Sequence, residues 1–362
     1  TLQSSSAASD VYKRQTEDLI RQKLGEVSYP GFSRDIVSFG LVKGVVIDGD
    51  DVTVQISLAT RDPNIPRGIH EGIESVLNEV EGIGKVSIDF DIQDPPEPVT
   101  GGDPSAGQSS IPGVKKIIAV ASGKGGVGKS TVSTNLAIAL SKAGAKVGLC
   151  DCDLYGPSVA LMLGAADRQP MATEQNEIIP IEAHGIKAIS MGFLLSDDSP
   201  VIVRGPLATR YTQQFLRQCV WGELDYLILD LPPGTGDIQL TISQTVAVDA
   251  AVVVTTPQEV ALIDARKAAS MFEKVNVPIA GIVENMAWFE CDLGTRYYIF
   301  GEGGGTREAE RLGVPLLGQI PLDPPTRQHA DEGQPVATLD SKESPISAAF
   351  ADLAGMVKTL VN

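Results

Sequence analysis

The chain has 362 residues, of which 43% are hydrophobic, so it is long enough for two domains with a sizeable core. Its net charge of −17 argues against broad binding to nucleic acid or to anionic membranes, because both require clustered Lys and Arg. No apolar run approaches the length of a membrane span, and the four cysteines are too scattered for a disulfide framework. We therefore expect a protein of the reducing cytoplasm with no membrane or nucleic-acid partner.

Four segments follow one another along the chain. Residues 1–15 are rich in Ser and Ala, and we expect them to be a disordered or non-native tail. Residues 16–93 have the pattern of a small α+β domain, and residues 94–113, rich in Pro, Gly and Ser, form a linker to the second domain at residues 114–362. The small domain is expected to contain a short helix at residues 16–24, two strands at residues 52–58 and 86–91, and a longer helix at residues 67–80.

The second domain alternates short buried strands with helices. Its strands are expected at residues 117–120, 146–150, 226–229, 251–254, 279–283 and 316–320. Continuous apolar runs of this kind, separated by helices, are typical of a parallel sheet that is covered on both faces. The sequence therefore predicts an α/β fold with a mainly parallel, doubly wound sheet, preceded by the small α+β domain.

A glycine-rich stretch joins the first of these strands to a helix expected at residues 132–143. Its glycines allow backbone N–H groups to turn inward around an anion, and the N-terminus of the helix adds its positive end. Lys129 can reach the β- and γ-phosphates of a nucleotide, and the Ser130 hydroxyl can ligate Mg²⁺. The expected nucleotide-binding residues of this stretch are Gly123, Lys124, Gly125, Gly126, Val127, Gly128, Lys129, Ser130 and Thr131.

Three aspartates follow two of the buried strands. Asp151 and Asp153 end the second strand, where residue alternation places both on one face and Cys150 and Cys152 on the other. At the carboxyl edge of such a sheet the two aspartates would point toward the ligand crevice, although they could instead cap the next turn. Asp230 closes another apolar run as the Walker B aspartate, which holds Mg²⁺ through water. We expect the two cysteines to be small buried residues and not metal ligands.

The loop reads Gly-Lys-Gly-Gly-Val-Gly-Lys-Ser from Gly123 onward, and its second lysine makes it resemble the deviant phosphate loop of the MinD/ParA ATPases. Residues 154–158 and 231–237 resemble switch I and switch II of the Mrp-type iron–sulfur carriers. The chain is identified as a member of the Mrp/ApbC iron–sulfur cluster carrier family. This membership implies an ATP-binding, slowly ATP-hydrolysing cluster carrier that needs Mg²⁺ and a homodimer. Its implied partners are apo iron–sulfur proteins and assembly factors.

The resemblance also assigns roles to residues at the loop and the strand ends. Lys124 would cross to the nucleotide of a second subunit, which implies the dimer, and Asp153 would orient the attacking water. The catalytic residues implied are Lys124, Lys129 and Asp153. The Mg²⁺ residues expected are Ser130, Asp151 and Asp230.

Two further segments are expected to contact the base of the nucleotide. Asn285 follows a buried strand, and its amide suits the donor and acceptor pattern of the adenine edge. Pro321 and Asp323 resemble the segment that passes the other side of the base. Either segment could also be an ordinary strand-end turn.

The chain departs from the family pattern at its cysteines. The front domain resembles iron–sulfur assembly factors, in which a cysteine usually follows the central strand, but residues 59–66 contain no thiol. A docking or scaffold role is therefore expected for this domain. After Asn285 the family commonly has Cys-x-x-Cys, which two subunits share to bind a bridging [4Fe–4S] cluster. Here only Cys291 is present, so a dimer would offer two thiolates where four are normal.

Two other classes of function stay open. A nucleotide-gated scaffold would bind iron–sulfur assembly partners without carrying a cluster, and the missing cysteines favour it. A positioning ATPase of the MinD/ParA type would act at a surface, which needs a basic amphipathic tail or a basic DNA patch. Residues 345–362 have apolar spacing but only Lys358 as a base, which disfavours membrane targeting.

Overall fold

The computed structural model describes residues 17, 19–30, 35–37, 40–60, 63–80, 82–93, 110–173, 175, 177–194 and 205–361. The predicted tail at residues 1–15 and most of the predicted linker lie outside the described residues. The described chain forms two compact units, residues 17–93 and 110–361, and each has its own buried core.

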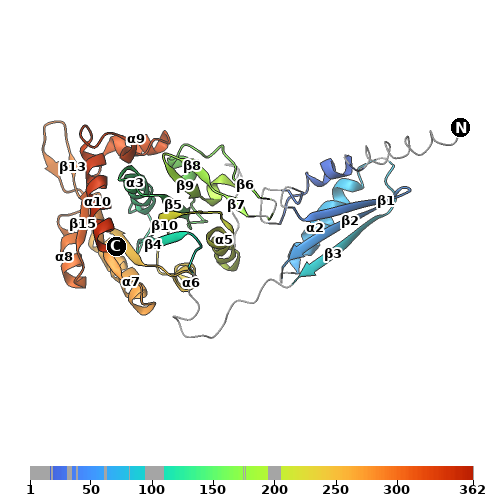
Figure 1. Cartoon of the computed structure of the whole chain (residues 1–362), viewed down its shortest axis with the longest axis horizontal. Helices are drawn as coiled ribbons and strands as arrows, with labels where there is room; N and C mark the ends of the chain where they lie inside the picture. Colours follow the sequence, from blue (N-terminus) through green and yellow to red (C-terminus); the bar gives the residue numbers. More distant parts are fainter. Residues whose placement is uncertain are drawn as a thin grey trace. The chain divides into compact units, whose positions relative to one another are not determined.

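The first unit is a three-stranded sheet with one long helix (Figure 1). Its elements are β1 (Val42–Asp48), β2 (Asp51–Ala59), α2 (Asn64–Leu77) and β3 (Val86–Gln93). β1 and β2 pair antiparallel, whereas β2 and β3 pair in parallel and are connected by α2. The two predicted strands and the longer predicted helix are present, and residues 19–24 of the predicted short helix are helical as well. β1 is a further strand that the sequence pattern did not indicate.

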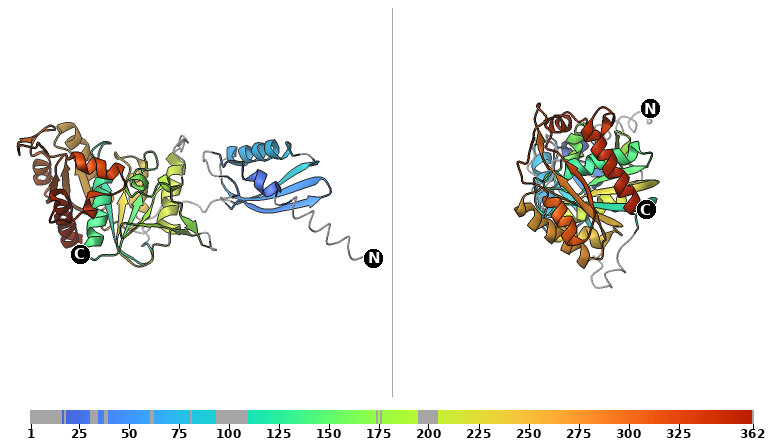
Figure 2. Two further views of the ribbon diagram at one scale, coloured as in Figure 1. Left: turned by 90° about the horizontal axis from the view of Figure 1, so that it is seen from above. Right: turned by 90° about the vertical axis from the view of Figure 1, so that its left-hand side faces the viewer.

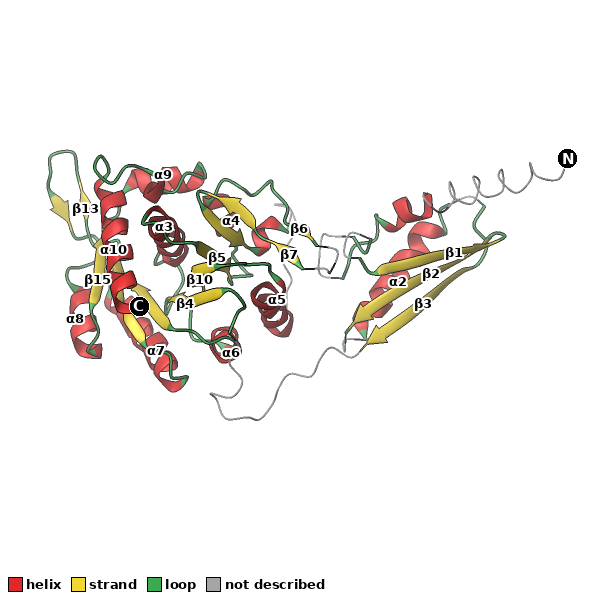
Figure 3. Cartoon of the chain, viewed as in Figure 1, coloured by secondary structure: helices red, strands yellow, loops and turns green. Residues whose placement is uncertain are grey.

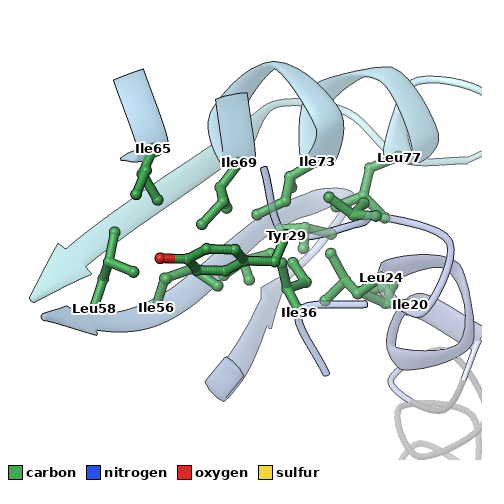
Figure 4. Packing of buried hydrophobic residues seen from close by; sticks show 13 residues of the cluster. Ile20, Leu24, Tyr29, Ile36, Ile56, Leu58, Ile65, Ile69, Ile73 and Leu77 are labelled. Carbon is green, nitrogen blue, oxygen red and sulfur yellow. The ribbon is translucent and has the colours of Figure 1, made fainter. Parts of the chain in front are cut away.

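The core of the first unit lies between α2 and the inner face of the sheet (Figure 4). Buried residues four apart form one stripe along the helix: Ile65, Ile69, Ile73 and Leu77. Alternate residues of β2 face this stripe, and Tyr29 lies among them. The helix begins at Asn64, three residues before the predicted start. It follows Pro63, whose fixed φ and missing N–H are compatible with the start of a helix.

The second unit is built on an eight-stranded sheet in the order β15-β12-β11-β4-β10-β5-β9-β8. Neighbouring strands pair in parallel, except that β8 runs antiparallel to β9 at one edge. The strands are β4 (Val114–Ala121), β5 (Val147–Asp151), β8 (Ile181–Ala183), β9 (Ile186–Ile189), β10 (Leu224–Asp230), β11 (Ala250–Thr255), β12 (Ile279–Asn285) and β15 (Leu316–Ile320). The predicted mainly parallel sheet is confirmed, and β8 and β9 are additions.

Helices cover both faces of this sheet (Figures 1 and 3). One face carries α3 (Lys129–Lys142), α4 (Val159–Met162), α9 (Pro324–Asp331) and α10 (Pro345–Val361). The other carries α5 (Gly205–Gln218), α6 (Asp237–Thr245), α7 (Glu259–Lys274) and α8 (Gly304–Leu312). The red C-terminal helix α10 packs beside the green α3 (Figure 2). None of the helices in the described part of the chain has the length and apolar composition needed to cross a bilayer.

Shorter elements lie between these helices and strands. They are β6 (Met171–Ala172), β7 (Ile178–Ile179), η1 (Met191–Phe193), β13 (Phe289–Glu290), β14 (Arg296–Tyr297) and η2 (Val336–Thr338). β13 and β14 pair antiparallel as a small hairpin that directly follows the end of β12 in the chain.

The carboxyl ends of the central strands meet at one edge of the sheet. Asp230 of β10 is in register with Val120 of β4 on one side and with Asp151 of β5 on the other. β4 is fully buried from Ile117 to Ala121, so packing fixes the point at which the glycine-rich loop begins. The loop and the two aspartates are thereby brought to the same level of the sheet, which is where open α/β sheets bind ligands.

Candidate functional site

The glycine-rich loop connects β4 to α3 in a conformation that needs its glycines. Gly126 and Gly128 have φ of 78° and 81°, in the left-handed region that disfavours residues with a Cβ. A Cβ at Gly128 would also overlap with the amide group of Asn285. α3 begins directly after Gly128, and no side chain caps its first turn. The N–H groups there are available to an anion, which suits a phosphate-binding site.

Lys129, the first residue of α3, forms a buried ion pair with the Walker B aspartate. Its Nζ lies 2.8 Å from Asp230 Oδ1, and the two side chains are 6% and 0% exposed. Ser133 donates a second hydrogen bond to the same oxygen, at 2.7 Å. Asp230 Oδ2 has no hydrogen-bond partner within the described part of the chain. A buried carboxylate oxygen without a partner is uncommon, and here it fits a water bound to a metal ion.

The neighbouring oxygen groups also fit Mg²⁺, which prefers hard oxygen ligands and keeps several waters. The Ser130 hydroxyl lies 3.3 Å from Lys129 Nζ, the same ammonium that contacts Asp230 Oδ1 at 2.8 Å. The structure thus brings together Lys129, Ser130 and Asp230, three residues that the sequence placed at the phosphates and the metal.

Asp151 and Asp153 shape the turn that follows β5. Asp151 Oδ2 accepts hydrogen bonds from Ser190 Oγ at 2.8 Å and from the Val159 N–H at 3.3 Å, and its Oδ1 accepts one from the Asp153 N–H at 3.0 Å. These are the turn-capping contacts that the sequence left open as an alternative. Burial, together with the charge of Asp230, raises the pKa of Asp151 to about 7. Burial also raises the pKa of Asp153, which is less deeply buried.

The residues expected at the base lie at the same sheet edge. Asn285 ends β12 and is 6% exposed, and its Nδ2 donates to the carbonyl of Val127 in the loop at 2.8 Å. Pro321 directly follows β15. Asp323 Oδ2 accepts hydrogen bonds from the N–H and hydroxyl of Thr326 at 2.8 and 2.6 Å, so this carboxylate caps α9.

The four cysteines differ sharply in accessibility. Cys150 and Cys152 are buried, with sulfurs 3.8 Å apart, and the hydrogen bond between them and burial raise the pKa of Cys150. Burial raises the pKa of Cys219 to about 12. Cys291, beside β13, is partly exposed, and hydrogen bonds from the backbone N–H groups of Leu293 and Thr295 lower its pKa. The described residues contain no group of three or more His, Cys, Asp or Glu that could hold a metal ion.

Two serines of the site were not predicted from the sequence. Ser133 bonds to Asp230, and its spacing of one helical turn after Lys129 was a usable signal. Ser190 bonds to Asp151 and follows β9, a strand that the sequence did not predict, so no local pattern indicated it.

The fold and this loop define a P-loop NTPase of the MinD/ParA type, and comparison with solved structures agrees. MinD of Pyrococcus horikoshii, complexed with Mg-ADP, is 28% identical with a TM-score of 0.53, covering 68% of this chain and 96% of that one. A nucleotide-binding protein of Archaeoglobus fulgidus in complex with ADP is 40% identical with a TM-score of 0.55, covering 61% and 87%.

Within that class, a family model described as the NUBPL iron-transfer P-loop NTPase matches residues 113–358, and the chain belongs to this family. A second model, described as an iron-sulfur cluster assembly protein, matches residues 17–90. The iron-sulfur cluster carrier protein of Deinococcus radiodurans is 45% identical over 338 residues, 93% of each chain. That of Escherichia coli K12 is 50% identical over 251 residues, 69% of this chain and 68% of the relative. The predicted family membership is confirmed.

Proposed function

We propose that this protein binds Mg–ATP, hydrolyses it slowly as a homodimer, and carries iron–sulfur clusters to apoproteins. The observation behind this proposal is that the phosphate loop is hydrogen-bonded to the start of the segment that contains the partly exposed thiol of Cys291. Asn285 holds the loop through the Val127 carbonyl, and Cys291 follows six residues later in the chain. The similarity to relatives named iron-sulfur cluster carriers over 93% of both chains supports the same conclusion. The free cysteines suit a reducing cytoplasm.

The chemistry of hydrolysis follows from the groups around the loop. Lys129 and the N–H groups at the start of α3 would bind the β- and γ-phosphates, while Ser130 and Asp230 would hold Mg²⁺. Bound Mg²⁺ would neutralise part of the phosphate charge. Asp153 would accept a hydrogen bond from the attacking water and so orient it. In taking up the phosphates, Lys129 must exchange its contact with Asp230 for the nucleotide.

The cluster would be cargo, because one chain does not offer the ligands for a resident cluster. Two copies of Cys291 supply two thiolates, and the remaining ligands would come from a small thiol or from the client apoprotein. The front unit contains no cysteine, so we assign it to docking of clients or assembly factors. A scaffold that binds the same partners without a cluster is the second candidate, and the single accessible thiol favours it.

Anaerobic reconstitution with iron and sulfide separates the two candidates. A carrier will show cluster absorption in the visible spectrum after desalting, and will transfer the cluster to an apo-ferredoxin, whose own spectrum reports the transfer. A protein that keeps no iron or sulfide above the level of a cysteine-free control protein, and transfers none, is not a carrier. Pelleting with liposomes or DNA in the presence of ATP would instead reveal a positioning ATPase.

The homodimer is proposed from Lys124. Its side chain is half-buried in the loop and makes no hydrogen bond or ion pair with the described residues, so its ammonium is free to reach a second nucleotide. We expect Lys124→Ala to bind ATP with wild-type affinity and to lose the part of the hydrolysis rate that rises with protein concentration. Mass measurements at micromolar protein check the state of assembly. A wild-type protein that stays monomeric with ATP contradicts the cross-subunit role.

A further inference from the structure

Ser122, the residue between β4 and the glycine-rich loop, makes two contacts in opposite directions. It is 1% exposed. Its hydroxyl donates a hydrogen bond to the backbone carbonyl of Lys124 at 2.9 Å. Its own carbonyl accepts a hydrogen bond from the N–H of Gly234 at 2.9 Å. A single buried residue therefore links Lys124 to the loop that follows β10.

The backbone that follows Ser122 is packed against α7 at Gly123 and exposed at Gly125 and Gly126. At Gly123 a Cβ would overlap with the backbone of Asp264 in α7, so the chain there is pressed against that helix. Gly125 and Gly126, after Lys124, are exposed, and no atoms lie within 4 Å of a Cβ built at Gly126. Within the described part of the chain, the hydrogen bond from the Ser122 hydroxyl is thus the one that restrains the carbonyl of Lys124.

The other end of the link lies in the segment that resembles switch II. Gly234 has φ of 96°, a conformation that suits glycine, and its N–H is directed to Ser122. A second hydrogen bond restrains the same segment: the side-chain amide of Gln239, a buried residue, donates to the carbonyl of Pro232. Backbone segments of this kind respond to the γ-phosphate in P-loop NTPases. A displacement of Gly234 would therefore weaken or break the hydrogen bond that its N–H donates to the Ser122 carbonyl.

We propose that Ser122 is a positioning residue that transmits the position of Gly234 to Lys124, and so directs the Lys124 ammonium toward the nucleotide of the second subunit. The inference rests on the proposed dimer role of Lys124. It assigns to Ser122 no contact with nucleotide or metal. Its loss should therefore affect the rate and not the binding of ATP.

The test is a double-mutant cycle on the full chain. We expect Ser122→Ala to keep KM for ATP within about twofold of wild type and to lower kcat by about two- to tenfold, the usual range for one hydrogen bond. In the Lys124→Ala background, Ser122→Ala should lower the rate no further. Ser347→Ala is the matched control, because Ser347 is also buried and its hydroxyl also donates to a backbone carbonyl, that of Leu339, at 2.9 Å. It should leave kcat unchanged.

The outcomes separate this inference from the proposed function. If Lys124→Ala loses its concentration-dependent rate but Ser122→Ala behaves like Ser347→Ala, the inference is wrong and the dimer role stands. If Ser122→Ala lowers kcat equally in both backgrounds, Ser122 acts without Lys124 and the inference is also wrong. If Lys124→Ala has the wild-type rate, the dimer role of this lysine fails and the inference fails with it.

Discussion

Replacing Lys129 with alanine is expected to abolish the binding of Mg–ATP, with a loss of affinity of at least about a hundredfold. Lys129 is the cation at the start of α3, and in the proposed site it would supply charge-assisted hydrogen bonds to two phosphates. Isothermal titration calorimetry with ATP and Mg²⁺ measures the loss. A Lys129→Ala protein that is folded and binds ATP like the wild type would contradict the assignment of the site.

The same substitution has a second consequence, which must be separated from the first. Asp230 is fully buried and is paired with Lys129, so its charge would lose its partner at a cost of about 3 to 5 kcal/mol of stability. The variant Lys129→Ala/Asp230→Asn removes that unpaired charge, and its amide can keep the contact with Ser133. We expect urea unfolding to show recovered stability in the double variant, while ATP binding stays absent. Recovery of both would mean that Lys129→Ala had failed only through misfolding.

The main sheet could be predicted because buried parallel strands appear in the sequence as continuous apolar runs. All six expected strands of the second unit are present, and the run at 226–229 extends by only a few residues to the observed β10. β8 and β9 were missed for a physical reason. They are short, β8 is the edge strand, and charged residues such as Glu182 and Lys187 interrupt their apolar pattern.

The sequence could predict those site residues that lie at or directly after the end of a buried strand. The loop and Asp230 follow buried strands within a recognisable pattern, so their common edge could be inferred from the parallel sheet. Contacts between distant segments could not. The bond from Asn285 to Val127 joins residues 158 positions apart, and the ion pair of Lys129 with Asp230 joins residues 101 apart. The hydrophobic pattern of a short stretch of sequence does not specify such contacts, because they depend on the order of the strands in the sheet.

Replacing Cys291 with serine is expected to remove nearly all the iron and sulfide that reconstitution adds, while ATP binding stays unchanged. Cys291 is the accessible thiol of the chain, and the N–H groups of Leu293 and Thr295 favour its thiolate, the form that binds iron. Cys150 and Cys152 are buried and in contact with each other at the end of β5. Iron, sulfide and protein are measured together after anaerobic desalting.

The matched controls are Cys150→Ser and Cys152→Ser, which should cost stability and leave the cluster content of the folded protein intact. Because two Cys291 thiolates supply only half of the ligands of a [4Fe–4S] cluster, the site should lose its cluster faster than a four-cysteine site. Added glutathione, which can complete the ligand shell, should slow that loss. Full iron content in Cys291→Ser would show that the cluster binds elsewhere or is adventitious. The chain would then act through its nucleotide-dependent surfaces alone, as a scaffold on which other proteins hold the cluster.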